Sequence, residues 1–302
     1  MANTNNLSDP EIPCISICRG RKWKNLRRQL LHGSKDGSFN LLRRPDAILR
    51  YSNKLEPEIM EALLALPEEQ QSFLKKDLKR SVTRAWLDGK SYVLKYFYHL
   101  HRWVIFSPDC KAWLGAHRLQ DRNACYAWFR RNDNRLAIII YEDAGDLDLY
   151  MPRCLSMPLP TLQYLFAQAG TCIALLHEQQ IFHADTKPGN FVFHSQDAKY
   201  TLSLIDKDDV RLYSRLAQRY QARNLAQFIG CSQPAHAQAY VPALQAFMRS
   251  YCLKRNFSPP QALKLFPEIR RAMQNLYPER ETLNSHIYHK LEHFLMQTDH
   301  FS

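Results

Sequence analysis

Apolar residues recur with two different periods along the chain. Before residue 143, β-branched and aromatic residues alternate with polar ones on both sides of Asp88-Gly89. That dipeptide favours a two-residue hairpin turn. The alternation predicts an antiparallel meander with strands at about 72–79, 81–87 and 90–97, a further strand at 135–142, and helices from residue 57 and at 107–121.

The apolar period becomes helical after residue 160. One face of the predicted helix from Thr161 carries Leu162, Leu165, Phe166, Ala169, Ile173 and Leu176. Short strands are expected at 191–194 and 200–206, and residues 211–298 are expected to be mostly helical. Strands first and helices later indicate an α+β fold with a small β-rich N-lobe and an α-rich C-lobe. The expected divisions are a basic extension at 1–45, an N-lobe at 46–143 and a C-lobe at 144–302.

The basic extension contains one amphipathic segment. Trp23, Leu26 and Leu30 lie at helical spacing among Arg21, Lys22, Lys24, Arg27 and Arg28. Such a helix can lie on an anionic membrane surface. It can equally pack its apolar stripe on the domain and leave the cations in solvent. The sequence leaves both interpretations open.

The charge of the chain indicates an anionic partner. The 302 residues carry a formal net charge of +12, which suits a phosphorylated small molecule, an acidic membrane or a nucleic acid. We expect no nucleic acid, because the aromatic residues lie mostly at core-like spacing rather than among cations on a strand face. No run of about 18 apolar residues occurs, so no transmembrane helix is predicted.

The segment HADTKPGN, residues 183–190, is the strongest candidate for chemistry. It lies in a loop between the long predicted helix and a strand. On such a loop Asp185 can orient or deprotonate a hydroxyl, while the amide oxygen of Asn190 can bind Mg²⁺ beside it. Lys187 can neutralise charge on a transferred phosphoryl group. This pattern predicts a phosphotransferase.

Two further positions complete the candidate site. Asp206 ends the strand at 200–206, with Asp208 two residues later, and Mg²⁺ prefers oxygen ligands of this kind. Lys95 lies within an apolar strand, from which it can reach the α- and β-phosphates of a nucleotide. We expect Asp185, Asn190 and Asp206 to meet around one magnesium ion.

With these motifs the chain resembles the protein-kinase-like superfamily. Within it, the chain is most similar to the bacterial lipopolysaccharide core kinases that phosphorylate Kdo or heptose. The resemblance covers about residues 70–230 and rests on KRSVTRAWLDGKSYVLKYF, HADTKPGNFVF and LIDKDDVRL. It implies a bilobal kinase-like fold that uses ATP and Mg²⁺.

The resemblance also implies a role for each site residue. Asp185 would position the acceptor hydroxyl, with His183 bracing the loop and Lys187 beside it. Asn190, Asp206 and Asp208 would form the metal-binding set, and Lys95 would contact the nucleotide phosphates. The segment Tyr141–Asp143, with Glu142 and Asp143, would lie near the adenine as the hinge.

The sequence departs from the kinase pattern in three places. The first strand connection has no glycines, so Lys79, Arg80 and Ser81 are expected to contact the phosphates instead. The helix at 107–121 offers no glutamate to pair with Lys95, and Asp109 is expected to cap its N-terminus. Lys207, rather than phenylalanine, follows the metal-binding acid. These departures keep a catalytically inactive binding module open as an alternative.

The predicted function is phosphorylation of a Kdo or heptose hydroxyl in the lipopolysaccharide inner core. The acceptor would be an anionic glycolipid or phosphorylated sugar. The enzyme would be a cytoplasmic monomer, peripheral at the inner face of the membrane. A protein kinase or small-molecule kinase of the same fold is the second alternative. Four arginines at four-residue spacing predict a positive stripe on the helix after the metal loop, or simply a solvated face: Arg211, Arg215, Arg219 and Arg223.

Overall fold

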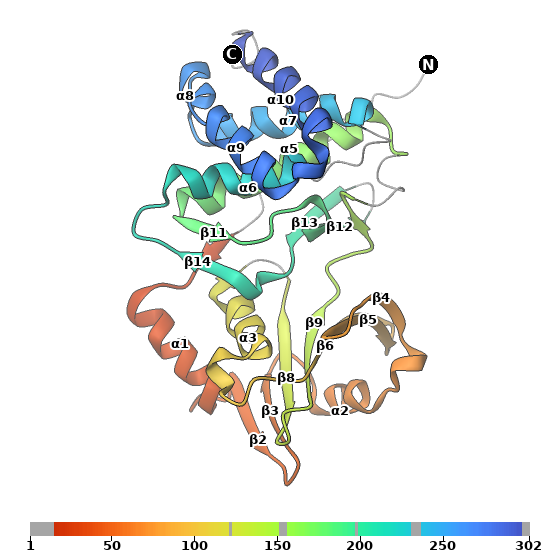
Figure 1. The fold of residues 1–302 in the computed structure, drawn as a ribbon. Helices are drawn as coiled ribbons and strands as arrows, with labels where there is room; N and C mark the ends of the chain where they lie inside the picture. The colour runs from red at the N-terminus through yellow and green to blue at the C-terminus, as the bar shows by residue number, and fades with distance from the viewer. Residues whose placement is uncertain (1–14, 121–122, 151–155, 197–198, 231–236, 298–302) are drawn as a thin grey trace. The chain divides into compact units, whose positions relative to one another are not determined.

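The computed structural model describes residues 15–120, 123–150, 156–196, 199–230 and 237–297. The chain forms two compact units, whose elements are shown in Figure 1. The sheet unit consists of residues 16–143 together with 206–209, and the helical unit contains 144–205 and the chain from 210 onward. One unit is rich in strands and the other in helices, so the predicted α+β class is confirmed.

The sheet unit is built on a seven-stranded antiparallel sheet with the order β2-β3-β8-β9-β6-β5-β4. The predicted meander is confirmed as β4, β5 and β6. The strands, in chain order, are β2 (Phe39–Arg43), β3 (Ala47–Ser52), β4 (Ser72–Lys76), β5 (Arg80–Leu87), β6 (Lys90–Tyr98), β8 (Cys125–Arg131) and β9 (Leu136–Glu142). A separate short pair joins β1 (Ser16–Ile17) to β7 (Leu119–Gln120).

Helices cover both faces of this sheet. Alternate side chains of a strand point to opposite faces, so each strand supplies two cores. One core joins Leu94 and Ile140 to Met60 and Leu63 of α2 (Pro57–Ala65). The other joins residues of the sheet to α1 (Gly20–His32) and α3 (Pro108–Arg118).

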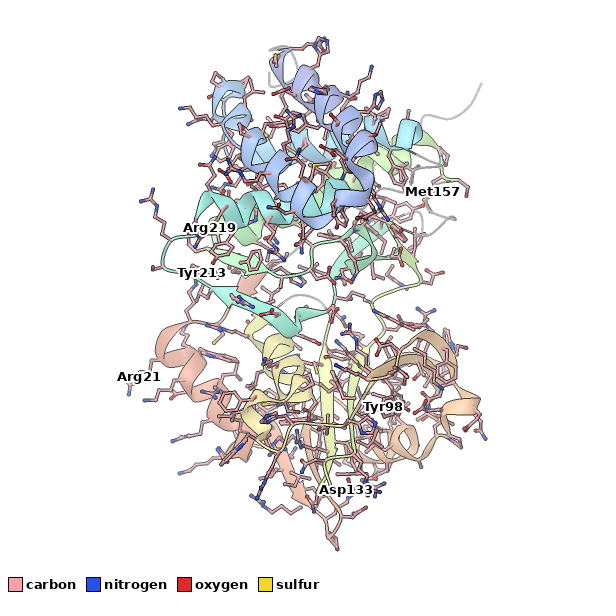
Figure 2. All side chains as sticks on the ribbon, viewed as in Figure 1. Arg21, Tyr98, Asp133, Met157, Tyr213 and Arg219 are labelled. Atoms are coloured by element: carbon pink, nitrogen blue, oxygen red, sulfur yellow. The ribbon has the colours of Figure 1, made fainter. Side chains whose placement is uncertain are left out.

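Helix α1 uses its apolar stripe for packing. Leu30 is fully buried, and Trp23 and Leu26 pack against the core beneath α3. The indole Nε1 of Trp113 in α3 donates a hydrogen bond of 3.2 Å to the Leu30 carbonyl. The packing interpretation of the amphipathic segment is therefore the one that the structure supports. The cations of α1 stay exposed, as Arg21 illustrates in Figure 2.

The helical unit contains two small sheets and a group of helices. The strands are β10 (Leu147–Asp148), β12 (Phe191–Gln196) and β13 (Lys199–Leu204) in one sheet, and β11 (Ile181–His183) with β14 (Val210–Leu212) in the other. The helices are α5 (Leu159–Glu178), α6 (Gln218–Gly230), α7 (Ala237–Lys254), α8 (Pro259–Leu263), α9 (Phe266–Leu276) and α10 (Glu281–Met296).

Helix α5 is the centre of the helical unit. Every apolar position predicted on its inner face is buried. Helix α7 approaches it closely at Gly170, where an added Cβ would lie 2.2 Å from the carbonyl oxygen of Phe247. In the described part of the chain, α5 alone is long and apolar enough to cross a membrane, yet 56% of that window is buried inside the unit. Such burial is typical of a core helix.

Candidate active site

The loop from His183 to Asn190 lies in the helical unit, between β11 and β12. Its last residues form a short 3-10 turn, Pro188–Asn190. The side-chain amide of Asn190 donates a 2.7 Å hydrogen bond to the carbonyl of Asp185, and Lys187 Nζ lies 2.5 Å from Asp185 Oδ2. The loop therefore brings together Asp185, Lys187 and Asn190, as the sequence predicts.

Helix α6 fixes this loop from behind. Asn224 Nδ2 donates to the His183 carbonyl at 2.5 Å, and the Thr186 hydroxyl donates to the Asn224 carbonyl at 2.8 Å. Gln227 Nε2 donates to the Ala184 carbonyl, and its Oε1 accepts from the Thr186 amide. Asn224 and Gln227 are functional residues that the sequence did not single out. Their signal is two amide residues three positions apart in the otherwise apolar last half of the helix, residues 224–230.

A buried histidine supports Asn224 in turn. His177 lies 3.2 Å from Asn224 Oδ1 and 2.9 Å from the Tyr251 hydroxyl. Burial lowers the pKa of His177 to about 3, so the ring is neutral at physiological pH. Because the amide nitrogen of Asn224 already donates to His183, its oxygen must accept from His177 Nε2. The hydrogen on Nε2 therefore holds Asn224 in the orientation that fixes the loop.

A second group of site residues lies in the sheet unit. Lys95 Nζ on β6 lies 2.6 Å from Asp206 Oδ1 and 2.6 Å from Asp208 Oδ2. Burial lowers the pKa of Lys95, but the charges of Asp208 and Asp206 outweigh it and raise the pKa above its usual value. Burial also raises the pKa of Asp208, against the opposing charge of Lys95. The lysine that the sequence left without an acidic partner is thus paired with both carboxylates.

Asp206 has an uncommon backbone conformation. Its φ is +59°, in the left-handed region that aspartate and asparagine tolerate better than most residues. The turn η4 (Lys207–Asp209) follows and packs on α3 at Gly115. A Cβ at Gly115 would lie 2.1 Å from the Lys207 carbonyl oxygen, so only glycine permits this approach.

We expect Gly115→Ala to move the segment at 206–209 away from Lys95. The added methyl group meets the backbone, which cannot turn aside as a flexible side chain can, and such overpacking costs about 1–3 kcal/mol. The KM for ATP should rise about tenfold. The free energy of unfolding should fall by about 1–3 kcal/mol. Gly37→Ala is not a matched control because its φ is positive. The control variant is Ala112→Gly in the same helix, which measures the effect of helix propensity. An unchanged KM in Gly115→Ala would contradict the expected displacement.

The connection between β4 and β5 is a tight turn. The Asp77 amide donates to the Arg80 carbonyl, and Asp77 Oδ1 accepts from the amides of Lys79 and Arg80 at 2.9 Å each. These hydrogen bonds lower the pKa of Asp77, and the bond from the Lys79 amide has the largest effect. The turn needs no glycine, which explains why the sequence has none here.

Ser81 points away from Lys95, which corrects the expected grouping of Lys79, Arg80 and Ser81. In the β5–β6 register Val82 is opposite Lys95, and Ser81 is opposite Tyr96 on the other face of the sheet. The Ser81 hydroxyl is buried and lies 2.8 Å from the Tyr98 hydroxyl. Arg80 shares the face of Lys95, and the charges of Asp206 and Asp208 act on it. Lys79 and Arg80 remain the candidates for phosphate contact.

The end of β9 carries the predicted hinge residues. Asp143 Oδ2 lies 2.7 Å from Arg84 Nε and accepts a 2.5 Å hydrogen bond from the Ser91 hydroxyl. Glu142 Oε2 accepts a 3.2 Å hydrogen bond from the Ala124 amide. These contacts fix the segment beside β5 and β6. The expected proximity of Glu142 and Asp143 to adenine stays a prediction.

Asp109 does not cap α3, contrary to the prediction. The N-cap is Ser107, and Asp109 is fully buried in the first turn. Its carboxylate accepts hydrogen bonds of 2.9 Å from Trp128 Nε1 and of 2.9 and 3.0 Å from Arg130 Nη1. The acid therefore ties α3 to β8.

The predicted arginine stripe is wrong in its geometry. Arg211 belongs to β14, and Arg215 lies before the start of α6. The helix itself carries Arg219, labelled in Figure 2, and Arg223. All four side chains are exposed, but they do not share one helical face.

The donor set of the sheet unit fits a magnesium ion. An ammonium group already bridges Asp206 and Asp208, touching one oxygen of each, which shows that the pair can enclose a cation. Mg²⁺ typically takes one or two carboxylates and completes its shell with water and phosphate oxygens. No cluster of three acidic, histidine or cysteine ligands occurs among the described residues, in keeping with such a sparse site. The convergence of Asp206 with Asp185 and Asn190 stays a prediction.

The family comparison agrees with the motifs. Residues 125–251 match the model of the lipopolysaccharide kinase (Kdo/WaaP) family. A solved structure described as WaaP in complex with acyl carrier protein is 18% identical, with 80% of this chain and 94% of that chain covered and a TM-score of 0.43. No curated protein matches the chain. The family match confirms the predicted resemblance to lipopolysaccharide core kinases and, with it, the prediction of a phosphotransferase.

Proposed function

With residues 125–251 matching a lipopolysaccharide kinase family, we propose that this kinase transfers the γ-phosphoryl group of ATP to a sugar hydroxyl, of Kdo or heptose, in the lipopolysaccharide inner core. The observation that carries the proposal is the loop at 183–190. In it Lys187 is paired with the Asp185 carboxylate, while Asn190 and Asn224 hold the loop backbone at the carbonyls of Asp185 and His183. A carboxylate beside a cation on a fixed loop suits hydroxyl phosphorylation.

In the proposed reaction Asp185 accepts a hydrogen bond from the acceptor hydroxyl and takes its proton. The hydroxyl oxygen forms a bond to the γ-phosphorus, and the bond from that phosphorus to the oxygen of ADP breaks. Lys187 lies beside Asp185 and stabilises negative charge on the phosphoryl oxygens. His183 holds the loop, since its carbonyl accepts the bond from Asn224.

The nucleotide would be held by cations of the sheet unit. Lys95 would contact the phosphates, with Lys79 and Arg80 at the turn above β5. Asp206 and Asp208, together with Asn190, would hold Mg²⁺, which neutralises charge on the phosphates when bound.

We expect the full chain to phosphorylate extracted core lipopolysaccharide at least tenfold faster than casein. The reason is the family match, since a glycolipid acceptor requires a site that a peptide does not fill. Incorporation of ³²P from γ-labelled ATP measures both rates, and chelation of divalent cations should abolish the signal. Equal or faster labelling of casein would favour a protein kinase, and no labelling of either acceptor would favour the inactive binding module.

An exposed apolar surface of the sheet unit supports the proposal of a location at the bilayer. Trp103, Ile105 and Phe106, between β6 and α3, are 67%, 51% and 62% exposed. No acidic residue occurs from 99 to 108, where Arg102 adds positive charge. Aromatic residues beside cations suit the interface of an anionic bilayer. The proposed acceptor would be anchored in such a bilayer, so we propose peripheral association through this surface.

Vesicle sedimentation tests this association. We expect the chain to bind vesicles of phosphatidylglycerol and phosphatidylcholine more strongly than pure phosphatidylcholine. Trp103→Ser combined with Phe106→Ser should weaken binding about tenfold or more, because each buried aromatic side chain contributes about 1.5–3 kcal/mol. Trp86→Ser is the control, since Trp86 is 66% exposed on β5, outside this surface. Equal losses in both variants would contradict the assigned surface.

A further inference from the structure

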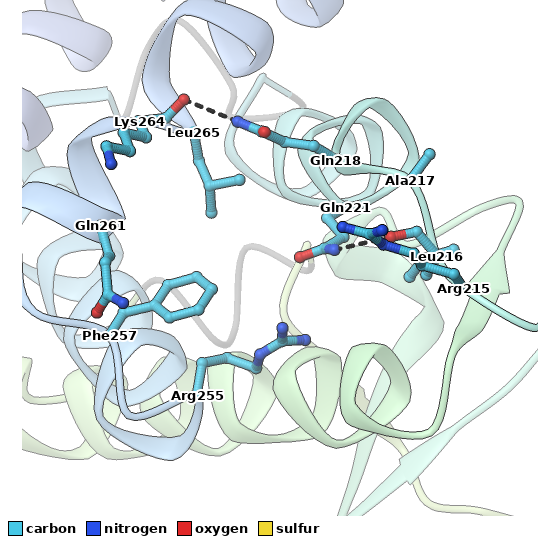
Figure 3. A pocket seen from close by; sticks show the side chains of 10 residues that line it. All are labelled: Arg215, Leu216, Ala217, Gln218, Gln221, Arg255, Phe257, Gln261, Lys264 and Leu265. Carbon is cyan, nitrogen blue, oxygen red and sulfur yellow. Dashed lines mark hydrogen bonds between the residues drawn. The ribbon is translucent and has the colours of Figure 1, made fainter.

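A pocket of about 550 Å³ lies in the helical unit between the start of α6 and the segment from Arg255 to Leu265. Figure 3 shows the side chains that line it. Its lining includes the cations Arg215, Arg255 and Lys264 and no carboxylate. Phe257 and Leu265 supply apolar surface. A pocket with this lining favours an anion that also carries an apolar face.

Arg255 is the most informative residue of the pocket. Its Nη1 is buried and has no hydrogen-bond partner among the described residues. The guanidinium lies over the ring of Phe257, with its carbon 5.1 Å from the ring centroid, which holds it in place. A buried charged donor without a partner is costly, and a phosphate or carboxylate would satisfy it.

The amides of the pocket suit hydroxyl groups. Gln218 Nε2 donates to the Lys264 carbonyl at 2.8 Å, and Gln221 Nε2 donates to the Leu216 carbonyl at 3.0 Å. The protein takes one of the two hydrogens on each amide nitrogen, and the two amide oxygens can accept hydrogen bonds from a ligand. Figure 3 shows the Gln221 oxygen directed toward the pocket. Acceptors beside an aromatic ring and cations are what an acidic sugar needs.

We propose that this pocket binds a sugar bearing a phosphate or carboxylate group, as a second site for the anionic glycolipid acceptor apart from the catalytic loop. The inference rests on the proposed function for the identity of the ligand as part of the acceptor. Arg255 and Lys264 contact the anionic group, and Gln221 accepts from ring hydroxyls. The site is attached to the catalytic loop through α6, which begins in the pocket and carries Asn224.

Calorimetric titration of the full chain with glucose 6-phosphate, without ATP or Mg²⁺, tests the site. Glucose and inorganic phosphate are the comparison arms. We expect glucose 6-phosphate to bind at least tenfold more tightly than either, because only it offers both the anion and the hydroxyls. Arg255→Gln should weaken this binding about tenfold or more, since a hydrogen bond to a charged group contributes about that factor. Lys264→Gln on the exposed rim is the second variant and should weaken it about threefold or more.

Arg271→Gln removes the same charge outside the pocket, where Arg271 is bonded to Glu268, and should change binding less than twofold. Two results would overturn the proposal. One is an equal loss of binding in Arg271→Gln and Lys264→Gln. The other is no binding of glucose 6-phosphate by the unaltered chain at 10 mM, a concentration on the order of weak sugar affinities. The readout is independent of catalysis. If transfer to lipopolysaccharide is absent while sugar phosphate binds, the proposed function fails and the pocket stands.

Discussion

Asp185→Asn is expected to lower kcat for phosphate transfer by about 10²–10⁴-fold, the range found for a positioned general base. Asparagine keeps the shape of the side chain but cannot accept the proton of the acceptor hydroxyl. The backbone carbonyl of Asp185, which accepts from Asn190, is unchanged by the substitution. The rate should therefore fall without loss of the loop. Single-turnover transfer from γ-labelled ATP to core lipopolysaccharide measures it.

Stability separates a chemical role of Asp185 from a structural one. Its pairing with Lys187 is more than a third exposed on both sides, and such pairs contribute about 0–1 kcal/mol. The melting temperature and the affinity for ATP should stay close to those of the unaltered chain. Asp88→Asn, at the exposed β5–β6 turn, is the matched control and should keep full activity. A kcat within tenfold of the original in Asp185→Asn would remove Asp185 from the reaction.

The local parts of the site could be predicted from the sequence. HADTKPGN places an acid, a cation and an amide on one loop, and the structure joins them by hydrogen bonds within that segment. Spacing along the chain is enough for such groups, because a short loop between a strand and a strand leaves few arrangements. The meander around Asp88-Gly89 and the inner face of α5 follow from periodicity for the same reason.

The long-range partners could not be predicted in this way. Asn224 is 41 positions from His183, whose carbonyl it holds, and no local pattern connects the two. The kinase pattern predicts a glutamate partner for Lys95 on α3, whereas the structure supplies Asp206 and Asp208 from a segment more than a hundred residues away. Pairing of this kind depends on the tertiary fold.

The alternation of side chains along a strand is enough to separate Arg80 from Ser81. Successive residues of a strand face opposite ways, so Arg80 and Ser81 could not both face Lys95. The four-residue spacing of the arginines suggested one helix, but Arg211 lies in β14. Charged residues tolerate any exposed conformation, and their spacing carries little structural information.

The contacts of Asp109 show that α3 can be held in place without a glutamate paired to Lys95. In this chain the acid in the first turn of α3, Asp109, accepts hydrogen bonds from Arg130 and Trp128 of β8. The backbone of the same helix approaches the segment at 206–209 closely at Gly115. Helix α3 thus connects the sheet to Asp206 and Asp208 without an ion pair to Lys95. The contact depends on α3 being held firmly at its N-terminus.

We therefore expect Asp109→Ala to destabilise the sheet unit by about 3–5 kcal/mol, the cost of leaving one partner of a buried ion pair alone. Arg130 is 4% exposed, and its remaining bonds, to the His101 carbonyl and the Asn134 amide oxygen, do not neutralise its charge. The Trp128 indole also loses its acceptor. Urea denaturation followed by tryptophan fluorescence measures the change in the free energy of unfolding.

Glu58→Ala is the matched control, because Glu58 is likewise an acid in the first turn of a helix but is exposed on α2. It should cost less than about 1 kcal/mol. Combining Asp109→Ala with Arg130→Met should recover much of the loss, since removing both charges leaves no buried ion unpaired. If Asp109→Ala costs no more than Glu58→Ala, the carboxylate is not what holds α3 to β8. In that case apolar packing of Trp113 and Trp128 fixes the helix, and the double variant should be less stable than either single one.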